Sequence, residues 1–163
     1  MKYHNITKCD ILNGEGVRVV LWVSGCSHRC PDCQNPITWN PNVGLEFDEE
    51  AKKEFFNAIN NPDIDGVTFS GGDPLFEGNR DTILNLAQQI KQDFPDKNIW
   101  LYTGYTYEQI SNLEILKYIG VLVDCRFDKN KKQTNLLWRG SSNQRVIDVK
   151  QTLKSGQITL YCE

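Results

Sequence analysis

The sequence predicts an α/β protein of one domain, residues 1–163, built on a mostly parallel sheet. Short apolar runs suited to buried strands alternate along the chain with segments of helical spacing, and this order gives a parallel sheet with crossover helices. The length of 163 residues fits a single domain. A closed eight-fold βα barrel takes about 250 residues, so we expect an open sheet or a partial barrel.

The first half of the chain supplies the first strand and the first helix. Residues 19–23, with the sequence VVLWV, form the first clear buried strand. Asp48 suits the N-cap of a helix, and two glutamates follow it in the first turn. Ala51, Phe55 and Ile59 then recur at helical spacing. We therefore expect a strand, a long connection and an amphipathic helix.

The alternation continues in the middle of the chain. Residues 67–69 form a short strand that runs into a glycine pair, and residues 99–102 form the next strand. A helix between them is expected to end at Pro95, because proline cannot continue it. Its apolar face is made by Ile83, Ala87, Ile90 and Phe94.

The last part of the chain is predicted in less detail. Thr106 and Gln109 form a capping box at the start of a third helix. Its apolar side is made by Ile110, Leu113 and Leu116. Residues 121–123 are another buried strand, residues 128–132 a solvated charged loop, and residues 158–161 a candidate late strand.

Three cysteines follow the first strand in one short loop, as Cys26, Cys30 and Cys33. Three thiolates can ligate three irons of a four-iron cluster, whose usual set is four cysteines. The fourth iron is then open to a small molecule, which predicts that the cluster performs chemistry. A zinc site with His28 as fourth ligand is the alternative, but zinc sites usually pair two short knuckles, and only one is present here.

The remaining cysteines, Cys9, Cys125 and Cys162, are isolated in the sequence. We expect them to be small buried side chains, and we expect no auxiliary cluster. A short-spaced cysteine group in a reducing compartment indicates metal binding or catalysis and not disulfides. The cysteines therefore favour a cytoplasmic protein.

Composition excludes several functional classes. The formal net charge of −3 argues against broad nucleic-acid binding. No apolar stretch approaches the ~20 residues of a membrane span, and the first residues, MKYHN, lack the apolar segment of a signal peptide. We expect neither nucleic acid nor membrane as a partner.

Taken with these observations, the cysteine loop resembles the radical S-adenosylmethionine enzymes. The likeness extends along most of the chain, and its last two blocks resemble the family of activating proteins of anaerobic ribonucleoside-triphosphate reductases. The matching segments are NGEG (13–16), VSGC (23–26), QN (34–35), TW (38–39), SGGDPL (70–75), YTGY (102–105) and WRGSSNQR (138–145).

This resemblance implies a fold, cofactors and an activity. The fold would be a cut-down, incomplete βα barrel of the radical S-adenosylmethionine type, with ligands at the carboxyl ends of its strands. A [4Fe-4S] cluster on Cys26, Cys30 and Cys33 would reductively cleave S-adenosylmethionine. The resulting 5′-deoxyadenosyl radical would take a hydrogen atom from a glycine of the large subunit of the reductase. The electron would come from a flavodoxin-type donor, and no side chain is expected to act as a general acid or base.

The resemblance also assigns cofactor-binding residues. The segment Gly71-Gly72-Asp73 resembles the family's Gly-Gly-Glu, which binds the amino group of the methionine moiety, and a side chain at Gly72 should block this approach. A plain strand-to-helix turn is the alternative. The candidates for the adenine end are Asp32, Cys33 and Gln34. Asp32 stands where many relatives carry an aromatic residue, and a surface charge is its alternative role.

Three residues at strand ends complete the candidates. Thr103, Asp124 and Arg126 could contact the ribose or the methionine carboxylate, or could serve in capping and ion pairing. The sequence does not decide whether residues 138–144 bind a cofactor, bind a partner or bind neither. Two other functions are also left open: a different radical S-adenosylmethionine enzyme, and a non-enzymatic iron–sulfur carrier or zinc-stabilised binding module.

Overall fold

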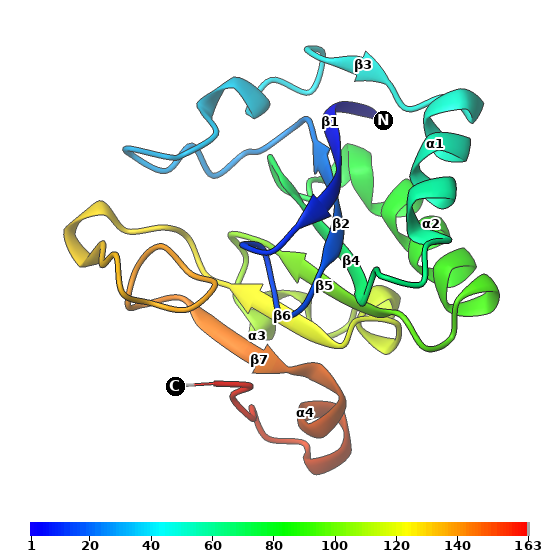
Figure 1. The fold of residues 1–163 in the computed structure, drawn as a ribbon. Helices are drawn as coiled ribbons and strands as arrows, with labels where there is room; N and C mark the ends of the chain where they lie inside the picture. The colour runs from blue at the N-terminus through cyan, green and yellow to red at the C-terminus, as the bar shows by residue number, and fades with distance from the viewer. Residues whose placement is uncertain (163) are drawn as a thin grey trace.

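The computed structural model describes residues 1–162. They form one open sheet of seven strands in the order β3-β1-β2-β4-β5-β6-β7 (Figure 1). The strands are β1 (Lys2–Asp10), β2 (Arg18–Val23), β3 (Leu45–Glu46), β4 (Gly66–Gly71), β5 (Asn98–Tyr102), β6 (Val121–Asp124) and β7 (Arg145–Asp148). The helices are α1 (Glu49–Ile59), α2 (Arg80–Asp93), α3 (Tyr107–Ile110) and α4 (Val149–Ser155).

The prediction of an α/β sheet is confirmed, but the sheet is mixed. Strands β2, β4, β5 and β6 are parallel neighbours. Strand β1 runs antiparallel to β2 and to β3, and β7 runs antiparallel to β6. The expectation of a mostly parallel sheet therefore holds only for the centre, because the crossover helices that impose parallel order connect only the central strands.

Local sequence signals placed most of the central elements correctly. The four predicted strands correspond to β2, β4, β5 and β6. Asp48 caps α1 by accepting a hydrogen bond from the Ala51 amide at 2.9 Å. The predicted faces of α1 and α2 are buried, except that Phe94 is half-buried at the C-cap of α2. The charged segment after β6 is an exposed turn at Lys129–Lys131.

Other elements differ from the prediction. The capping box of Thr106 and Gln109 is present, but α3 has only four residues. Ser111 and Asn112 follow it, and such residues favour turns over helix interiors, so the chain continues as a separate 3₁₀ turn at Glu114–Lys117. Residues 158–161 make only one isolated bridge, between Leu160 and Ile147.

The sheet divides the interior into two hydrophobic clusters. The larger cluster lies between the sheet and the helices, with α1 and α2 side by side on one side of the sheet (Figure 1). The smaller one lies on the opposite face around Trp100. Arg18 is fully buried on that face, where its guanidinium stacks on Trp100 and donates to the Thr68 hydroxyl and to main-chain carbonyls.

This topology places several loops at one edge of the sheet. The carboxyl ends of parallel strands meet at the same edge. The long segment after β2 and the loop between β6 and β7 both project there, on the left of Figure 1. No helix within residues 1–162 combines the length and the apolar character needed to cross a membrane.

Candidate functional site

The three cysteines of the loop after β2 open on one cavity. Cys26, Cys30 and Cys33 are all partly exposed, and all three line a cavity of about 150 Å³. The loop is tied to the following segment by two main-chain hydrogen bonds, Gly25 N to Thr38 O at 2.7 Å and Cys26 N to Trp39 O at 3.0 Å. The spacing therefore places the three thiols around a common space.

The backbone of this loop takes two left-handed conformations. Arg29 has a φ of 48° and Asp32 a φ of 58°. A left-handed conformation costs an L-residue about 1–2 kcal/mol, and aspartate tolerates it better than most. Contacts with the rest of the protein must therefore hold the loop in the shape that directs its thiols into the cavity.

The donor set fits an iron–sulfur cluster. Thiolates are the usual ligands of such clusters, and hydrogen bonds to sulfur tune them; here the Asn35 amide donates to Cys33 Sγ at 3.4 Å. Burial raises the pKa of the Cys26 thiol, so cluster binding must displace a proton from it. Within residues 1–162, no three His, Cys, Asp or Glu side chains converge to hold a single metal ion. The fit to a cluster therefore rests on the three thiols that line one cavity and on the hydrogen bond to sulfur.

The isolated cysteines are not the buried side chains we expected. Cys9 is exposed, and Cys125 and Cys162 are only half-buried. Cys125 has a φ of 74° and lines the same cavity as the three loop cysteines. Its thiol donates to Asp124 at 3.3 Å, and burial together with that carboxylate raises the pKa of Cys125 to about 11. The sequence did not predict that Cys125 lies near the three loop cysteines. Cys125 is far from them in the sequence, and only the folding of the sheet brings the carboxyl end of β6 to this cavity.

Gly71 and Gly72 form another wall of the cavity, and packing within the protein requires both glycines. Gly71 has a φ of 108°. A Cβ at Gly72 would lie 2.5 Å from the Gly25 carbonyl oxygen and 2.9 Å from that of Thr38. A side chain at Gly72 would thus push on the backbone that carries Cys26, before it met any ligand.

We accordingly expect Gly72→Ala to disturb the cysteine loop itself. Overpacking of this kind costs about 1–3 kcal/mol, which for a chain of this size lowers the melting temperature by roughly 2–10 °C. The melting temperature of the metal-free protein measures the effect. Gly120→Ala is the matched control, because a Cβ there meets its nearest atom at 3.5 Å. Equal melting temperatures for the two variants would contradict this view of the segment.

Asp73 and Thr103 lie deeper in the same wall. Asp73 is 1% exposed, and its carboxylate accepts hydrogen bonds from the Thr103 hydroxyl and from His28 Nε2. His28, which lies within the cysteine loop, therefore donates a hydrogen bond to Asp73. Asp73 and Thr103 also line the cavity of the three cysteines.

A second cavity of about 430 Å³ adjoins the first, and Cys33 lines both. Its volume lies in the range of small-molecule sites. Gln34 lines this larger cavity, whereas Asp32 is exposed and lines neither one. The other residues shared by the two cavities are Ser70, Tyr102, Phe127 and Gln144.

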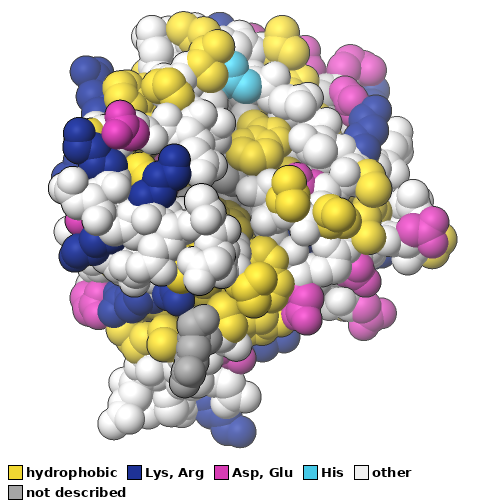
Figure 2. All heavy atoms as spheres, turned by 60° about the vertical axis from the view of Figure 1, so that its left-hand side comes forward, with side chains coloured by type: hydrophobic (Ala, Val, Ile, Leu, Met, Phe, Trp, Pro, Cys, Tyr) yellow, Lys and Arg dark blue, Asp and Glu magenta, His cyan; other side chains and the backbone are white. Residues whose placement is uncertain are grey.

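The segment 138–144 forms one side of the larger cavity. Trp138, Arg139, Gly140 and Gln144 all line it. Arg139 donates to the Gln144 carbonyl at 2.8 Å, while its buried Nε has no partner among the described residues. Figure 2 shows the molecule turned so that the left-hand side of Figure 1 comes forward, with hydrophobic side chains gathered over the middle of this face. The sequence pattern alone did not assign this segment to a cavity.

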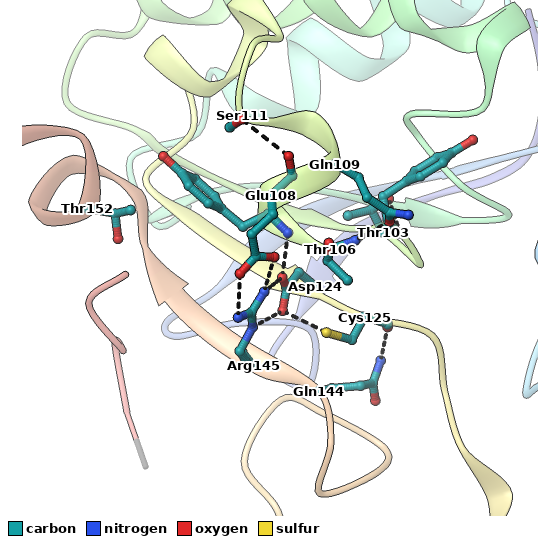
Figure 3. A network of polar contacts seen from close by, with 12 residues as sticks. Thr103, Thr106, Glu108, Gln109, Ser111, Asp124, Cys125, Gln144, Arg145 and Thr152 are labelled. Atoms are coloured by element: carbon teal, nitrogen blue, oxygen red, sulfur yellow. Dashed lines mark hydrogen bonds and ion pairs between the residues drawn. The ribbon is translucent and has the colours of Figure 1, made fainter. Parts of the chain in front are cut away.

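Asp124 and Arg126 make contacts within the protein. Asp124 is fully buried and accepts from the Tyr107 amide at 2.7 Å, at the first turn of α3. Arg145 donates to both oxygens of Asp124, at 3.0 and 2.5 Å, and also pairs with Glu108 (Figure 3). The capping and ion-pairing role is thus the one that Asp124 performs here. Arg126 Nη2 donates to the main-chain carbonyl of His28.

A larger hollow lies elsewhere on the protein. It measures about 830 Å³ and lies between β1, β3 and α1. Charged side chains that pair with one another, such as Lys8 with Glu54 and Lys53 with Glu50, make up much of its lining. Neither cysteine nor histidine is among the described residues that line it.

Comparisons with known proteins agree with this arrangement. A family model described as a 4Fe-4S single cluster domain matches residues 12–147. The anaerobic ribonucleoside-triphosphate reductase-activating protein of Enterobacteria phage T4 is 47% identical over 146 residues, which cover 90% of this chain and 93% of that protein. Proteins of the same name from Escherichia coli (strain K12) and Haemophilus influenzae are 42% and 39% identical, each match covering 90% of this chain and 97% of the relative. The chain therefore belongs to the 4Fe-4S single cluster domain family and to the family of anaerobic ribonucleoside-triphosphate reductase-activating proteins.

Proposed function

We propose that this chain is an oxidoreductase that activates an anaerobic ribonucleoside-triphosphate reductase by generating a glycyl radical on it, with a [4Fe-4S] cluster and S-adenosylmethionine as cofactors. The observation that carries the proposal is the set of three thiols around one cavity that opens into a second cavity of small-molecule size. When bound, the reduced cluster supplies the electron that cleaves the carbon–sulfur bond of S-adenosylmethionine.

In this proposal the cluster is held by Cys26, Cys30 and Cys33. The methionine end of S-adenosylmethionine lies along the wall formed by Gly71, Gly72, Asp73 and Thr103. The adenine end extends into the larger cavity, past Cys33 and Gln34 and near the backbone of Asp32. The chain supplies position and shelter from water, while the cofactors supply the reactive electron.

The open sheet supports an incomplete βα barrel of the radical S-adenosylmethionine type. Its two hydrophobic clusters lie on opposite faces of one sheet, which supports a single domain over residues 1–163. The proposal also includes a cytoplasmic location, because cluster ligation needs reduced thiols, and the six cysteines are free.

The surroundings of the larger cavity support a protein substrate. Leu12, Ile37 and Leu137 are 77%, 68% and 60% exposed. They belong to three segments that also line this cavity, through Asn13, Asn35 and their neighbours. Exposed apolar side chains around a site mark an interaction surface. We assign this surface to the large subunit of the reductase, and we assign the supply of electrons to a flavodoxin-type donor.

Electron paramagnetic resonance on an anaerobic mixture tests the function. We expect a doublet-type glycyl radical when the chain, loaded with its cluster, is mixed with the reductase subunit, S-adenosylmethionine and reductant. Without the reductase, cleavage of S-adenosylmethionine should be slow, because the open cavity is not shielded from water.

The control is a reductase whose radical-site glycine is replaced by alanine, which should give no signal. A signal that persists in this variant would contradict the proposal. So would turnover of a free small molecule without any protein partner, which is the behaviour of other radical S-adenosylmethionine enzymes.

A further inference from the structure

We propose that Asp73 does not bind the amino group of S-adenosylmethionine, and that it holds the cysteine loop in place through His28. Both residues are thus positioning residues. This inference rests on the proposed function for the identity of the ligand.

The carboxylate of Asp73 has no acceptor capacity to spare. It receives four donors: the Leu75 amide at 2.8 Å, the Gly104 amide at 3.0 Å, the Thr103 hydroxyl at 3.0 Å and His28 Nε2 at 2.8 Å. An ionised carboxylate offers about four lone-pair sites. The Asp73 side chain is also only 2% exposed. An incoming ammonium group would have to displace one of these donors.

His28 connects the Asp73 carboxylate to the cysteine loop. It lies between Cys26 and Cys30 in the sequence, and its side chain is 11% exposed. Because a carboxylate only accepts, Nε2 must carry the proton of this hydrogen bond. The hydrogen bond is charge-assisted, and such bonds are about twice as strong as neutral ones.

Other contacts confine the same imidazole. Its ring packs edge-on against Tyr105, with ring centroids 4.6 Å apart. A Cβ at Gly104 would clash with the ring, so the loop after β5 approaches His28 closely. The main-chain carbonyl of His28 accepts from Arg126, which follows β6. His28 therefore connects the cysteine loop to the ends of β4, β5 and β6.

The direct-ligand and positioning roles predict different behaviour of the metal-free protein. If His28 and Asp73 hold the loop, loss of their hydrogen bond should loosen it before any cofactor binds. If Asp73 serves only as a ligand of S-adenosylmethionine, the metal-free loop should be unaffected. The rate at which a maleimide alkylates each thiol, followed by mass spectrometry, reports this looseness directly.

We expect His28→Leu to raise the alkylation rates of Cys26 and Cys30 about tenfold relative to exposed Cys9, as the loss of a charged hydrogen bond implies. His28→Gln places an amide donor near the former Nε2 and should restore most of the protection. His4→Gln is the matched control at the other histidine, on β1, and should leave the rates unchanged. Unchanged rates in His28→Leu would overturn the proposal.

A double-variant comparison separates the two roles of Asp73. The positioning role predicts that Asp73→Asn raises the same rates, and that adding His28→Leu raises them little further. It also predicts that both single variants, once loaded with cluster, lose S-adenosylmethionine affinity to a similar extent in calorimetry. Affinity lost in Asp73→Asn alone, with His28→Leu at wild-type affinity, would assign Asp73 as a ligand and overturn the proposal.

These outcomes are distinguishable from failure of the proposed function. Wild-type protein that assembles no cluster, or binds no S-adenosylmethionine when loaded, would contradict the proposed function and not the alkylation result. If Asp73→Asn does not fold, the His28 variants still decide the question, because they remove only one of the four donors.

Discussion

Replacing Cys30 with alanine should yield a protein without a four-iron cluster and without cleavage of S-adenosylmethionine. The cluster would keep only two of the three thiolates of the cysteine loop, where three are needed beside an open iron. Alanine at Cys26 or Cys33 should have the same effect. Iron and sulfide content after anaerobic reconstitution is the measurement, with about four irons per chain expected for the wild type.

The other cysteines provide the controls for this experiment. Cys9→Ala should retain four irons and full activity, because Cys9 is exposed on β1. Cys125→Ala is the sharper comparison. It removes a thiol from the same cavity, yet it should leave the iron content intact, because Cys125 follows β6 and lies outside the loop that carries the three closely spaced cysteines. Full activity in Cys30→Ala would rule out this ligand set.

Replacing Arg145 with methionine should destabilise the metal-free protein by about 3 kcal/mol. The substitution leaves the fully buried Asp124 carboxylate without its cation, and breaking a buried ion pair by removing one partner costs about 3–5 kcal/mol. We place the effect at the lower end because the Arg145 side chain is 29% exposed.

Urea unfolding measures this loss of stability. Lys131→Met, which removes an exposed pair with Asp128, should change stability by less than about 0.5 kcal/mol. A loss below about 1 kcal/mol in Arg145→Met would contradict the prediction.

The ion pair of Arg145 with Glu108 should make the stability of the protein depend on pH. Hydrogen bonding to Arg145 lowers the pKa of Glu108 from 4.5 to about 2. A carboxylate with a lowered folded-state pKa stabilises the fold above its unfolded value, and this contribution is lost as the pH falls through the folded value. The loss should therefore occur between pH 4.5 and about 2 in the wild type. In Arg145→Met, stability should vary less with pH across this interval.

The sequence predicted those elements whose signals are local. Asp48 indicated the start of α1, because an N-cap residue and the helix that it caps lie within a few residues of each other. Strands β2, β4, β5 and β6 were predicted because both of their faces are covered, which makes them apolar runs. Strand β1 was missed because only Tyr3 and Ile6 of its nine residues are buried. Its sequence, KYHNITKCD, therefore reads as polar.

The features of the candidate site also divide into those with a local sequence signal and those without one. The spacing of the three cysteines carried the metal prediction without help from the fold. The hydrogen bond from His28 to Asp73 joins residues 45 positions apart, and the pair of Arg145 and Asp124 spans 21. No local pattern signals such contacts, which is why the sequence left the roles of Asp124 and of residues 138–144 open.

The left-handed residues of the cysteine loop bear on protein engineering. Arg29 and Asp32 adopt conformations that a short peptide would not favour by itself. Main-chain bonds from the segment around Thr38 and Trp39 hold the beginning of the loop. Grafting the eight residues 26–33 onto another scaffold would transfer the three thiols without their arrangement. A functional transplant must carry the supporting segment and the ends of β4 and β5 as well, so this cysteine motif is portable only together with much of its sheet.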